Sequence, residues 1–229
     1  MKSPKFSICI PTWEQRGVGL RHLEHLIASI NRQTFKDFEL VISDHSQNDD
    51  IERFVSNLDC GILYKRNDRR YGNGVANLND CLKMADGDLI KIMFQDDFMF
   101  SDMCLETIYN HFTEDDTWLV CGCNHTRDDG HTFERYFTPR WNDRLLQGDN
   151  TISSPSVLTI RNNDVELFDE NLKMMMDVEY YYRLNLKFGK PKIIKECLIT
   201  NRQHKHQISA EYDWNKSKDE LLYLEKIYN

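Results

Sequence analysis

Apolar runs of strand length alternate with amphipathic segments of helical period up to about residue 125. The runs predict strands at 5–11, 38–42, 62–65, 89–94 and 118–123. Between them, apolar residues spaced three and four apart predict helices at 20–30, 75–85 and 103–112, the second closed by Gly87 as its C′ residue. Strands that alternate with helices at this spacing indicate an α/β fold with a mostly parallel sheet covered on both faces.

The pattern loosens after about residue 125 and then resumes with fewer elements. We expect a strand at 157–160, a helix at 178–186 and another strand at 193–200. Ser217-Lys218-Asp219-Glu220 has the spacing of a capping box and predicts a last helix behind it. With no repeat and no linker, the chain of 229 residues is expected to form one α/β unit with an appended C-terminal region.

Composition and charge limit the classes of partner. Hydrophobic residues make up 40% of the chain and charged ones 29%, as in ordinary globular proteins. The absence of a run of about 18 apolar residues predicts no transmembrane segment, and we expect a cytoplasmic protein. The formal charge of -8 argues against a nucleic-acid partner. The seven scattered cysteines are expected to be reduced core residues: Cys9, Cys60, Cys81, Cys104, Cys121, Cys123 and Cys197.

Acidic side chains follow three of the predicted strands. Glu14 comes just after the first strand, Asp44 after the second, and Asp96-Asp97 after the fourth. Ligands of open α/β sheets bind beyond the carboxyl ends of the strands, so these groups are expected to share one crevice. Carboxylates gathered there suit Mg²⁺ or Mn²⁺, which would also neutralise a diphosphate. The alternative is an acidic loop that is merely solvated.

Four stretches resemble family 2 glycosyltransferases of the GT-A fold when they are taken together and in order. They are Phe6 to Glu14 (FSICIPTWE), Gln33 to Asp44 (QTFKDFELVISD), Asn79 to Gly87 (NDCLKMADG) and FQDDFMF, which resembles the metal-binding DXD region. The resemblance implies a Rossmann-like α/β/α sandwich with a mostly parallel central sheet and a C-terminal elaboration on the acceptor side. Within a single domain 1–229, residues 1–100 would form the nucleotide-binding half and residues 101–229 the acceptor-side half.

The same resemblance implies roles for individual residues of the first half. The nucleobase and ribose would be bordered by Pro11, Thr12, Trp13 and Glu14, with Asp44 hydrogen-bonded to the base or the ribose. Asp96 would contact the ribose side, and Asp97 would hold the metal against the diphosphate. Lys65, Arg66, Arg69 and Arg70 could add positive charge for phosphate or could simply be solvated.

In the second half, Ser154-Pro155-Ser156 resembles the segment under the acceptor site, and Met176-Asp177-Val178-Glu179 resembles the acidic motif that supplies the base. Asp177 is therefore the expected catalytic base, with a helix N-cap as the alternative. Glu179 is expected to pair with Arg183 on an exposed helix face. Arg202 and His204 resemble a late Arg-x-His element whose His reaches the metal or diphosphate; a surface histidine is the alternative.

These residues predict an inverting glycosyltransferase assisted by Mn²⁺ or Mg²⁺. Its donor would be a UDP-, GDP- or dTDP-sugar, and its acceptor a carbohydrate or glycolipid hydroxyl. Two departures from the family pattern, Phe94 at the first Asp of the longer acidic motif and His45 where a second Asp often follows Asp44, leave a non-catalytic nucleotide-sugar binding module as an alternative. The remaining alternative is a Mg²⁺-dependent phosphotransfer or receiver-type domain that uses Asp44 or the Asp96-Asp97 pair.

Overall fold

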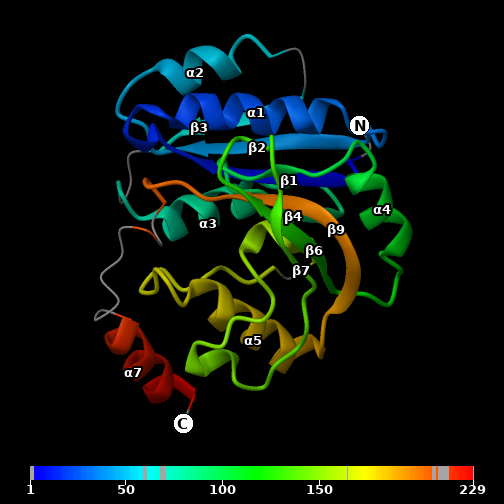
Figure 1. The fold of residues 1–229 in the computed structure, drawn as a ribbon, viewed down its shortest axis with the longest axis vertical. Helices are drawn as coiled ribbons and strands as arrows, with labels where there is room; N and C mark the ends of the chain where they lie inside the picture. The colour runs from blue at the N-terminus through cyan, green and yellow to red at the C-terminus, as the bar shows by residue number, and fades with distance from the viewer. Residues whose placement is uncertain are drawn as a thin grey trace.

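The computed structural model describes residues 3–58, 61–67, 71–163, 165–207, 210 and 217–228. Cys60, Arg69 and Arg70 lie outside these residues. Figure 1 shows the first strands and helices of the chain at one end of the molecule and the last helices at the other.

Four parallel strands form the N-terminal half of the sheet, in the spatial order β3-β2-β1-β4. Their apolar side chains are buried on both faces in the central strands, which explains why the sequence reads as continuous apolar runs. The strands are β1 (Phe6–Thr12), β2 (Phe38–Asp44), β3 (Ile62–Arg66) and β4 (Leu89–Ile92).

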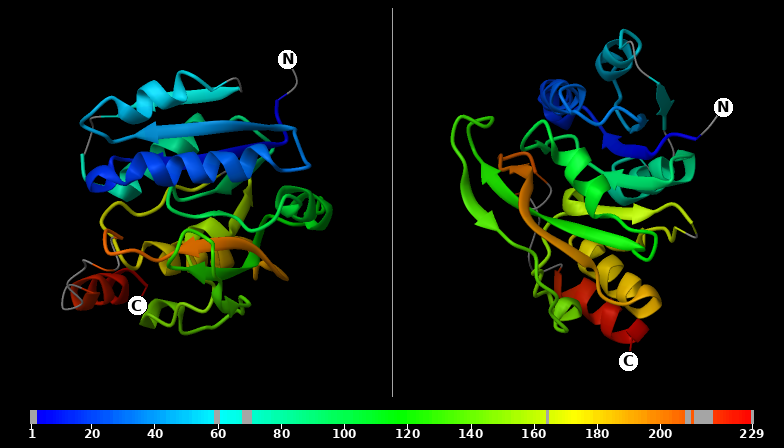
Figure 2. Two further views of the ribbon diagram at one scale, coloured as in Figure 1. Left: turned by 45° about the horizontal axis from the view of Figure 1, so that its top comes forward. Right: turned by 90° about the vertical axis from the view of Figure 1, so that its right-hand side faces the viewer.

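Helices cover both faces of this parallel half. β2 lies on one side of β1 and β4 on the other, so right-handed crossovers place α1 (Gly19–Asn31) and α3 (Gly74–Met84) on opposite faces (Figure 2). A third helix, α2 (Asp50–Val55), was not predicted from the sequence. The 3₁₀ turn η1 (Gln15–Gly17) leads from β1 into α1.

The C-terminal half extends the sheet with antiparallel and parallel pairs in the order β4-β8-β6-β9-β5, and β7 pairs with β6. The fold prediction is therefore confirmed as an α/β fold with a mixed, mostly parallel sheet. Two of these strands, β5 and β7, were missed from the sequence. The strands are β5 (Phe98–Met99), β6 (Trp118–Thr126), β7 (Glu134–Phe137), β8 (Leu158–Arg161) and β9 (Lys192–Arg202).

Among the described residues, the C-terminal half also contains three helices and two 3₁₀ turns. In Figure 1, α5 and α7 lie together at the end of the molecule opposite α1 and α2. The elements are α4 (Cys104–His111), η2 (Leu145–Gln147), η3 (Pro155–Val157), α5 (Met176–Phe188) and α7 (Ser217–Tyr228). No helix among the described residues is both long enough and apolar enough to cross a bilayer.

Several predicted boundaries differ from the structure by about one to three residues, and two of them bear on the packing around the site. β4 ends at Ile92 rather than at Phe94, because the Phe94 N–H turns away to donate to Ser156 Oγ, 3.0 Å away. α3 ends at Met84, so Gly87 is not its C′ residue. Glycine stands at position 87 because a Cβ there would lie 2.6 Å from the Ser7 backbone nitrogen on β1.

One hydrophobic cluster draws side chains from both halves of the sheet. Of the described cysteines, Cys197 is half-buried and the others are buried, and none forms a disulfide, as expected. A lysine also lies in this interior: the side chain of Lys91 on β4 is fully buried, and its Nζ donates to the carbonyls of Ser156 and Leu158. Burial lowers the pKa of Lys91 to about 8.

Candidate active site

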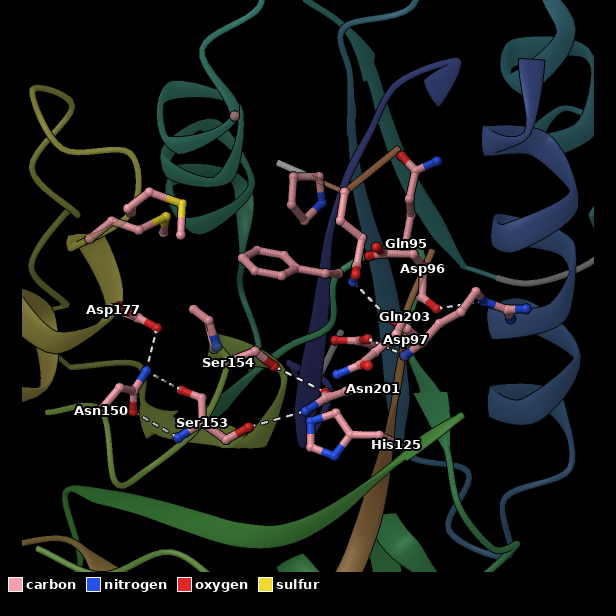
Figure 3. A pocket seen from close by; sticks show the side chains of 18 of the residues that line it. Gln95, Asp96, Asp97, His125, Asn150, Ser153, Ser154, Asp177, Asn201 and Gln203 are labelled. Carbon is pink, nitrogen blue, oxygen red and sulfur yellow. Dashed lines mark hydrogen bonds between the residues drawn. The ribbon is translucent and has the colours of Figure 1, made fainter. Parts of the chain in front are cut away.

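A pocket of about 610 Å³ opens where β1 and β4 end and the C-terminal half crosses over them. Figure 3 shows Asp96 and Asp97 on one side of it and Asp177, with Asn150, on the other. Of the residues predicted for the site, Pro11, Trp13, Asp96, Asp97 and Asp177 line this pocket. The two halves of the chain therefore meet at one site, with the acidic groups facing each other across it.

Trp13 is held in place through its backbone by Gln95. The Trp13 N–H donates to Gln95 Oε1 at 2.6 Å, and Gln95 Nε2 donates back to the Trp13 carbonyl at 2.9 Å. The same amide nitrogen donates to the carbonyl of Gly19 at 3.2 Å. A Cβ at Gly19 would lie 2.1 Å from the Trp13 carbonyl oxygen, so the start of α1 packs directly on this loop. The end of β1 and the start of the acidic pair thus form one rigid unit.

Asp96 and Asp97 have different partners. The backbone N–H of Arg202 donates to Asp97 Oδ1 at 3.1 Å, and Arg202 Nε donates to the backbone carbonyl of Asp96 at 2.9 Å. The Asp96 carboxylate faces His204, with 3.0 Å between Oδ2 and Nε2. Burial, followed by the charge of Asp96, raises the pKa of Asp97 well above its usual value. The ionised form of Asp97 is therefore costly here unless a cation lies beside it.

Asp177 is the second residue of α5, and the N-cap position is taken by Met175. Its Oδ1 accepts from the Val178 N–H at 2.7 Å, and its Oδ2 accepts from Asn150 Nδ2 at 2.7 Å. Burial raises the pKa of Asp177 to about 7, although these hydrogen bonds act in the opposite direction. A carboxylate that titrates near neutrality while lining a pocket has the properties of a general base.

A chain of polar contacts crosses the pocket floor from Asp177 towards Asp97 (Figure 3). Asn150 Nδ2 also reaches the Ser153 carbonyl at 3.2 Å, and Asn150 Oδ1 accepts from the Ser153 N–H at 2.9 Å. Asn201 Nδ2 donates to Ser153 Oγ at 3.1 Å, one residue before Arg202. Ser153 has φ of 96°, a left-handed conformation that is strained for a residue with a side chain. The two acidic sides of the pocket are therefore linked through a strained turn.

Asp44 does not line this pocket. Its side chain is fully buried and accepts from the Ser46 N–H and from Tyr64 Oη, both at 2.8 Å, while Arg66 Nε lies 3.5 Å away. The carboxylate is thus held by groups of β3 and of the turn after β2. Its predicted contact with base or ribose stays a prediction.

Glu14 and Thr12 lie beside the main pocket rather than on its wall. The Thr12 side chain is buried and its hydroxyl donates to the Ser43 carbonyl at 3.3 Å. Glu14 accepts from the Gln47 N–H at 3.2 Å and from Tyr71 Oη at 3.0 Å. Gln47 and Tyr71 line a second cavity of about 440 Å³ together with His45, Ser46, Arg66 and Asn67. The turn after β2 therefore lines this second cavity, and Glu14 contacts two of its lining residues.

His204 is packed behind Asp96 rather than on the pocket wall. Its ring lies 4.6 Å from the ring of His22, measured between centroids. Among the residues that the structure describes, no three His, Cys, Asp or Glu side chains are grouped so as to hold a metal ion. The buried and disfavoured charge of Asp97 fits a divalent cation, but oxygens of the donor diphosphate would have to complete its ligands.

Two expectations for charged side chains need adjustment. Glu179 does pair with Arg183, at 2.8 Å, but the face is buried rather than exposed: the Glu179 side chain also accepts from Tyr228 Oη at 2.6 Å. Of the basic residues considered for phosphate, Arg66 forms ion pairs with acidic side chains, with Nη2 3.0 Å from Glu52 Oε2. Lys65 is exposed on β3.

Sequence reasoning missed the amide side chains that organise the pocket, namely Gln95, Asn150 and Asn201. Asn150 lies in the stretch without periodicity, and nothing in its neighbourhood marked it. Gln95 had a usable signal, because it directly precedes the acidic pair at the end of a strand. Ser154 and Pro155, which the sequence associated with the acceptor segment, do line the pocket.

A family model described as "Glycosyl transferase family 2" matches residues 7–175. The chain belongs to this family. That assignment confirms a glycosyltransferase domain at the level of the family, and it speaks against the phosphotransfer or receiver-type alternative. Most of the predicted site residues fall within the matched range, and Asp177 and His204 follow it.

Solved structures agree on the fold. The family 2 chain resembles S. aureus TarS 1–349 in complex with UDP-GlcNAc, with a TM-score of 0.75 and 18% identity over 96% of this chain and 65% of that one. It also resembles the mannosyltransferase PcManGT from Pyrobaculum calidifontis in complex with GDP-Man and Mn2+, with a TM-score of 0.67 and 13% identity over 100% of this chain and 66% of that one.

A sequence relative covers a shorter stretch. The GalNAc(5)-diNAcBac-PP-undecaprenol beta-1,3-glucosyltransferase of Campylobacter jejuni is 34% identical over 101 residues, which is 43% of this chain and 31% of that protein. The match therefore spans less than a third of the relative's length.

Proposed function

We propose that this family 2 chain catalyses inverting transfer of a sugar from a nucleoside diphosphate donor to a hydroxyl acceptor. The observation that carries the proposal is the placement of Asp177 opposite Asp96 and Asp97 across one pocket. A donor diphosphate beside Asp97 would leave the sugar between the two sides, with the acceptor next to Asp177.

In the proposed step, Asp177 accepts the proton of the acceptor hydroxyl while the acceptor oxygen bonds to the anomeric carbon. The bond between that carbon and the diphosphate oxygen breaks on the opposite face, and its electron pair leaves with the nucleoside diphosphate. Inversion follows from a single displacement. The pKa of Asp177, raised to about 7 by burial, makes it basic enough to share this proton, and about half of the molecules carry it ionised at neutral pH.

On the donor side, the nucleoside would lie along Pro11, Thr12, Trp13 and Glu14, with Asp44 holding the turn after β2 and Asp96 near the ribose. Asp97 would hold a divalent ion, Mn²⁺ or Mg²⁺, with His204 as a further candidate ligand behind Asp96. Such an ion supplies Lewis-acid stabilisation of the departing diphosphate when it is bound. Mn2+ and GDP-Man in one structural neighbour, and UDP-GlcNAc in the other, support this class of donor and cofactor.

The acceptor is proposed to be a carbohydrate or a lipid-linked sugar. The name of the Campylobacter relative describes an undecaprenol-linked acceptor, which supports the second class. A non-catalytic module that binds the nucleotide sugar without turnover remains the competing outcome, because Phe94 lines the pocket where the longer acidic motif has an Asp.

We expect substitutions of the two acidic sides to separate chemistry from binding. Asp177→Asn should lower the metal-dependent hydrolysis of UDP-GlcNAc or GDP-mannose, in which water replaces the acceptor, by roughly 100-fold or more. Calorimetry with UDP or GDP and Mn²⁺ should show unchanged binding in that variant. Asp97→Asn should instead weaken nucleotide binding in the presence of Mn²⁺.

The exposed Asp115→Asn serves as the control and should behave as wild type. Hydrolysis at the wild-type rate by Asp177→Asn would remove the base assignment. Nucleotide binding by the wild-type chain without hydrolysis of either donor would favour the binding module.

A further inference from the structure

The carboxylate of Glu220 on α7 is bound by three consecutive backbone amides of a distant segment. Its Oε2 accepts from the N–H groups of Lys173 at 3.2 Å, Met174 at 3.0 Å and Met175 at 2.8 Å. From the sequence, Glu220 was expected to act only locally, as the last residue of a capping box. In the structure it ties the C-terminal helix to the start of α5.

These three amides stand at the positive end of α5. Met175 is the N-cap of this helix, and none of the helix's own carbonyls can satisfy the N–H groups at its start. A carboxylate that accepts from successive N–H groups at a helix start is favoured by hydrogen bonding and by the helix dipole. Glu220 therefore fixes both the position and the direction of the entry into α5.

The segment that Glu220 holds forms the wall of the pocket on the Asp177 side. Lys173, Met174 and Met176 line the pocket, and Asp177 is the next residue along the chain. A shift of the segment would move these side chains and the first turn of α5 together. Glu220 thus contacts the backbone of the segment whose side chains line the pocket where the acceptor would bind.

Two tyrosines of α7 contact residues that precede and follow the segment held by Glu220. Tyr223 Oη donates to Asp169 Oδ2 at 2.7 Å and accepts from Asn171 Nδ2 at 3.1 Å. Tyr228 Oη donates to Glu179 Oε1 at 2.6 Å. The helix is therefore attached before, at and after the start of α5, and Figure 1 shows α5 and α7 side by side.

We propose that Glu220 is a positioning residue for Asp177: by holding the amides of Lys173, Met174 and Met175, it sets the acceptor-side wall and the first turn of α5 in the geometry that transfer requires. This inference rests on the proposed function, since it takes Asp177 as the base. It assigns α7 a part in the reaction although the helix itself does not line the pocket.

Glu220 also acts on Asp177 through its charge. The groups that face Asp177 are Glu220 from α7, Asn150 from the segment before η3, Tyr181 one turn further along α5, and the Val178 N–H, with Lys173 on the same wall. Burial is the largest cause of the raised pKa of Asp177, and the negative charge of Glu220 raises it further. Removal of that charge should lower the pKa of Asp177.

The test compares Glu220→Ala, Glu220→Gln and the exposed neighbour Asp219→Ala, assayed by Mn²⁺-dependent hydrolysis of UDP-GlcNAc or GDP-mannose. Glu220→Ala should lower kcat by about 10- to 100-fold with little change in the KM for the donor, because misplacement affects the base and not the donor side. Hydrogen exchange of the amides at 173–175 should speed up in this variant alone. Glu220→Gln, which keeps an acceptor oxygen, should retain much of kcat and shift the acid limb of the pH profile to lower pH.

The outcomes separate this inference from the proposed function. If Asp177→Asn is inactive while Glu220→Ala matches Asp219→Ala in kcat and in its pH profile, the inference fails and the proposed function stands. If Asp177→Asn hydrolyses the donor normally, the proposed function fails regardless of Glu220. Should Glu220→Ala not fold, Glu220→Gln decides the matter: if its kcat, its pH profile and the exchange of the amides at 173–175 all match those of Asp219→Ala, the inference is overturned.

Discussion

Three carboxylates, two at or after strand ends and one at a helix start, show how surroundings decide what a single residue can do. Asp44 is fully buried but is met by two donors and by Arg66, so its charge is compensated within the protein. Asp97 is buried beside another carboxylate, which makes its charge costly. Asp177 is intermediate, because burial raises its pKa and its two hydrogen bonds offset only part of that rise. Only the last two line the main pocket.

Asn150→Ala is expected to impair Asp177 without touching the donor side. The hydrogen bond from Asn150 favours the ionised form of Asp177, so its loss should raise the pKa of Asp177 above about 7. A base must be ionised to work, so the acid limb of donor hydrolysis should move to higher pH, opposite to the shift expected for Glu220→Gln. The plateau rate should fall about tenfold because the carboxylate loses its orientation.

A pH–rate profile of UDP-GlcNAc or GDP-mannose hydrolysis measures both effects. Asn142→Ala is the matched control, since the Asn142 amide makes a turn contact in the same segment, with Arg144 rather than with Asp177. A profile for Asn150→Ala that superimposes on the control would show that Asp177 does not depend on this amide.

The candidate site was predictable from the sequence to the extent that its residues sit at element ends. Asp97 could be placed because it follows a predicted strand, and Asp177 because Met176-Asp177-Val178-Glu179 resembles the family's acidic motif. Asn150 could not, because its segment has no hydrophobic period and its role depends on a partner 27 positions away. The contacts of Glu220 could not be predicted for the same reason, because its partners lie 45 to 47 positions away.

At the scale of elements, the turn that contains Ser153 links the two acidic sides of the pocket. Its left-handed backbone costs free energy, yet its hydroxyl accepts from Asn201 and from Cys123 Sγ, the latter at 3.3 Å. Strain of this kind persists only where the surrounding contacts hold it. The turn therefore combines an unfavourable backbone with favourable side-chain contacts, and substitutions can separate the two.

Ser153→Gly and Ser153→Ala should differ in stability although both remove the hydroxyl. Glycine adopts the positive φ without strain, whereas alanine keeps the strain and loses the contacts. We expect the free energy of unfolding of the glycine variant to exceed that of the alanine variant by about 1 kcal/mol. Urea unfolding of both variants measures this difference, and equal midpoints would show that the turn is not strained.

The elements that the sequence did not reveal are short, and two of them, α2 and β7, are also largely exposed. α2 spans six residues and buries only two of them, too few for a clear helical stripe. β5 has two residues, and β7 has three exposed residues out of four. The longer elements were found because each of them buries a continuous run or a full stripe of apolar residues.

At the scale of the whole molecule, the parallel and mixed halves of the sheet join where β4 pairs with β8. The parallel half could be predicted, since strands alternating with helices imply its connections. The antiparallel pairing of β4 with β8 could not be predicted, because an apolar run does not show the direction of its strand. Lys91 crosses this joint, as its Nζ reaches carbonyls at and before the start of β8.

The stability of the molecule should depend on pH through Lys91. Its pKa is about 8 in the folded state, against about 10.4 for a lysine in an unfolded chain. Between these values the unfolded state binds more protons than the folded state, so folding becomes more favourable as the pH rises. Relative to Lys91→Met, the free energy of unfolding of the wild type should increase by up to about 3 kcal/mol from pH 8 to about pH 10.4.

Urea unfolding of the wild type and Lys91→Met across this range tests the expectation, and the exposed Lys195→Met should show no such trend. A constant difference between the wild type and Lys91→Met would mean that Lys91 titrates in the folded protein as it does in water.

The packing of Gly19 against the Trp13 loop limits which parts of the pocket can adjust to different substrates. No space exists there for even one added carbon, and the Gln95 amide ties the same loop to the acidic pair. The side of the pocket that we propose to hold the nucleotide is consequently a fixed template. Selection among acceptors, whether in evolution or by engineering, would therefore have to change the opposite side of the pocket. Met174 and Met176 line that side, and the contact of Glu220 with the backbone at 173–175, which a single substitution can remove, sets their position.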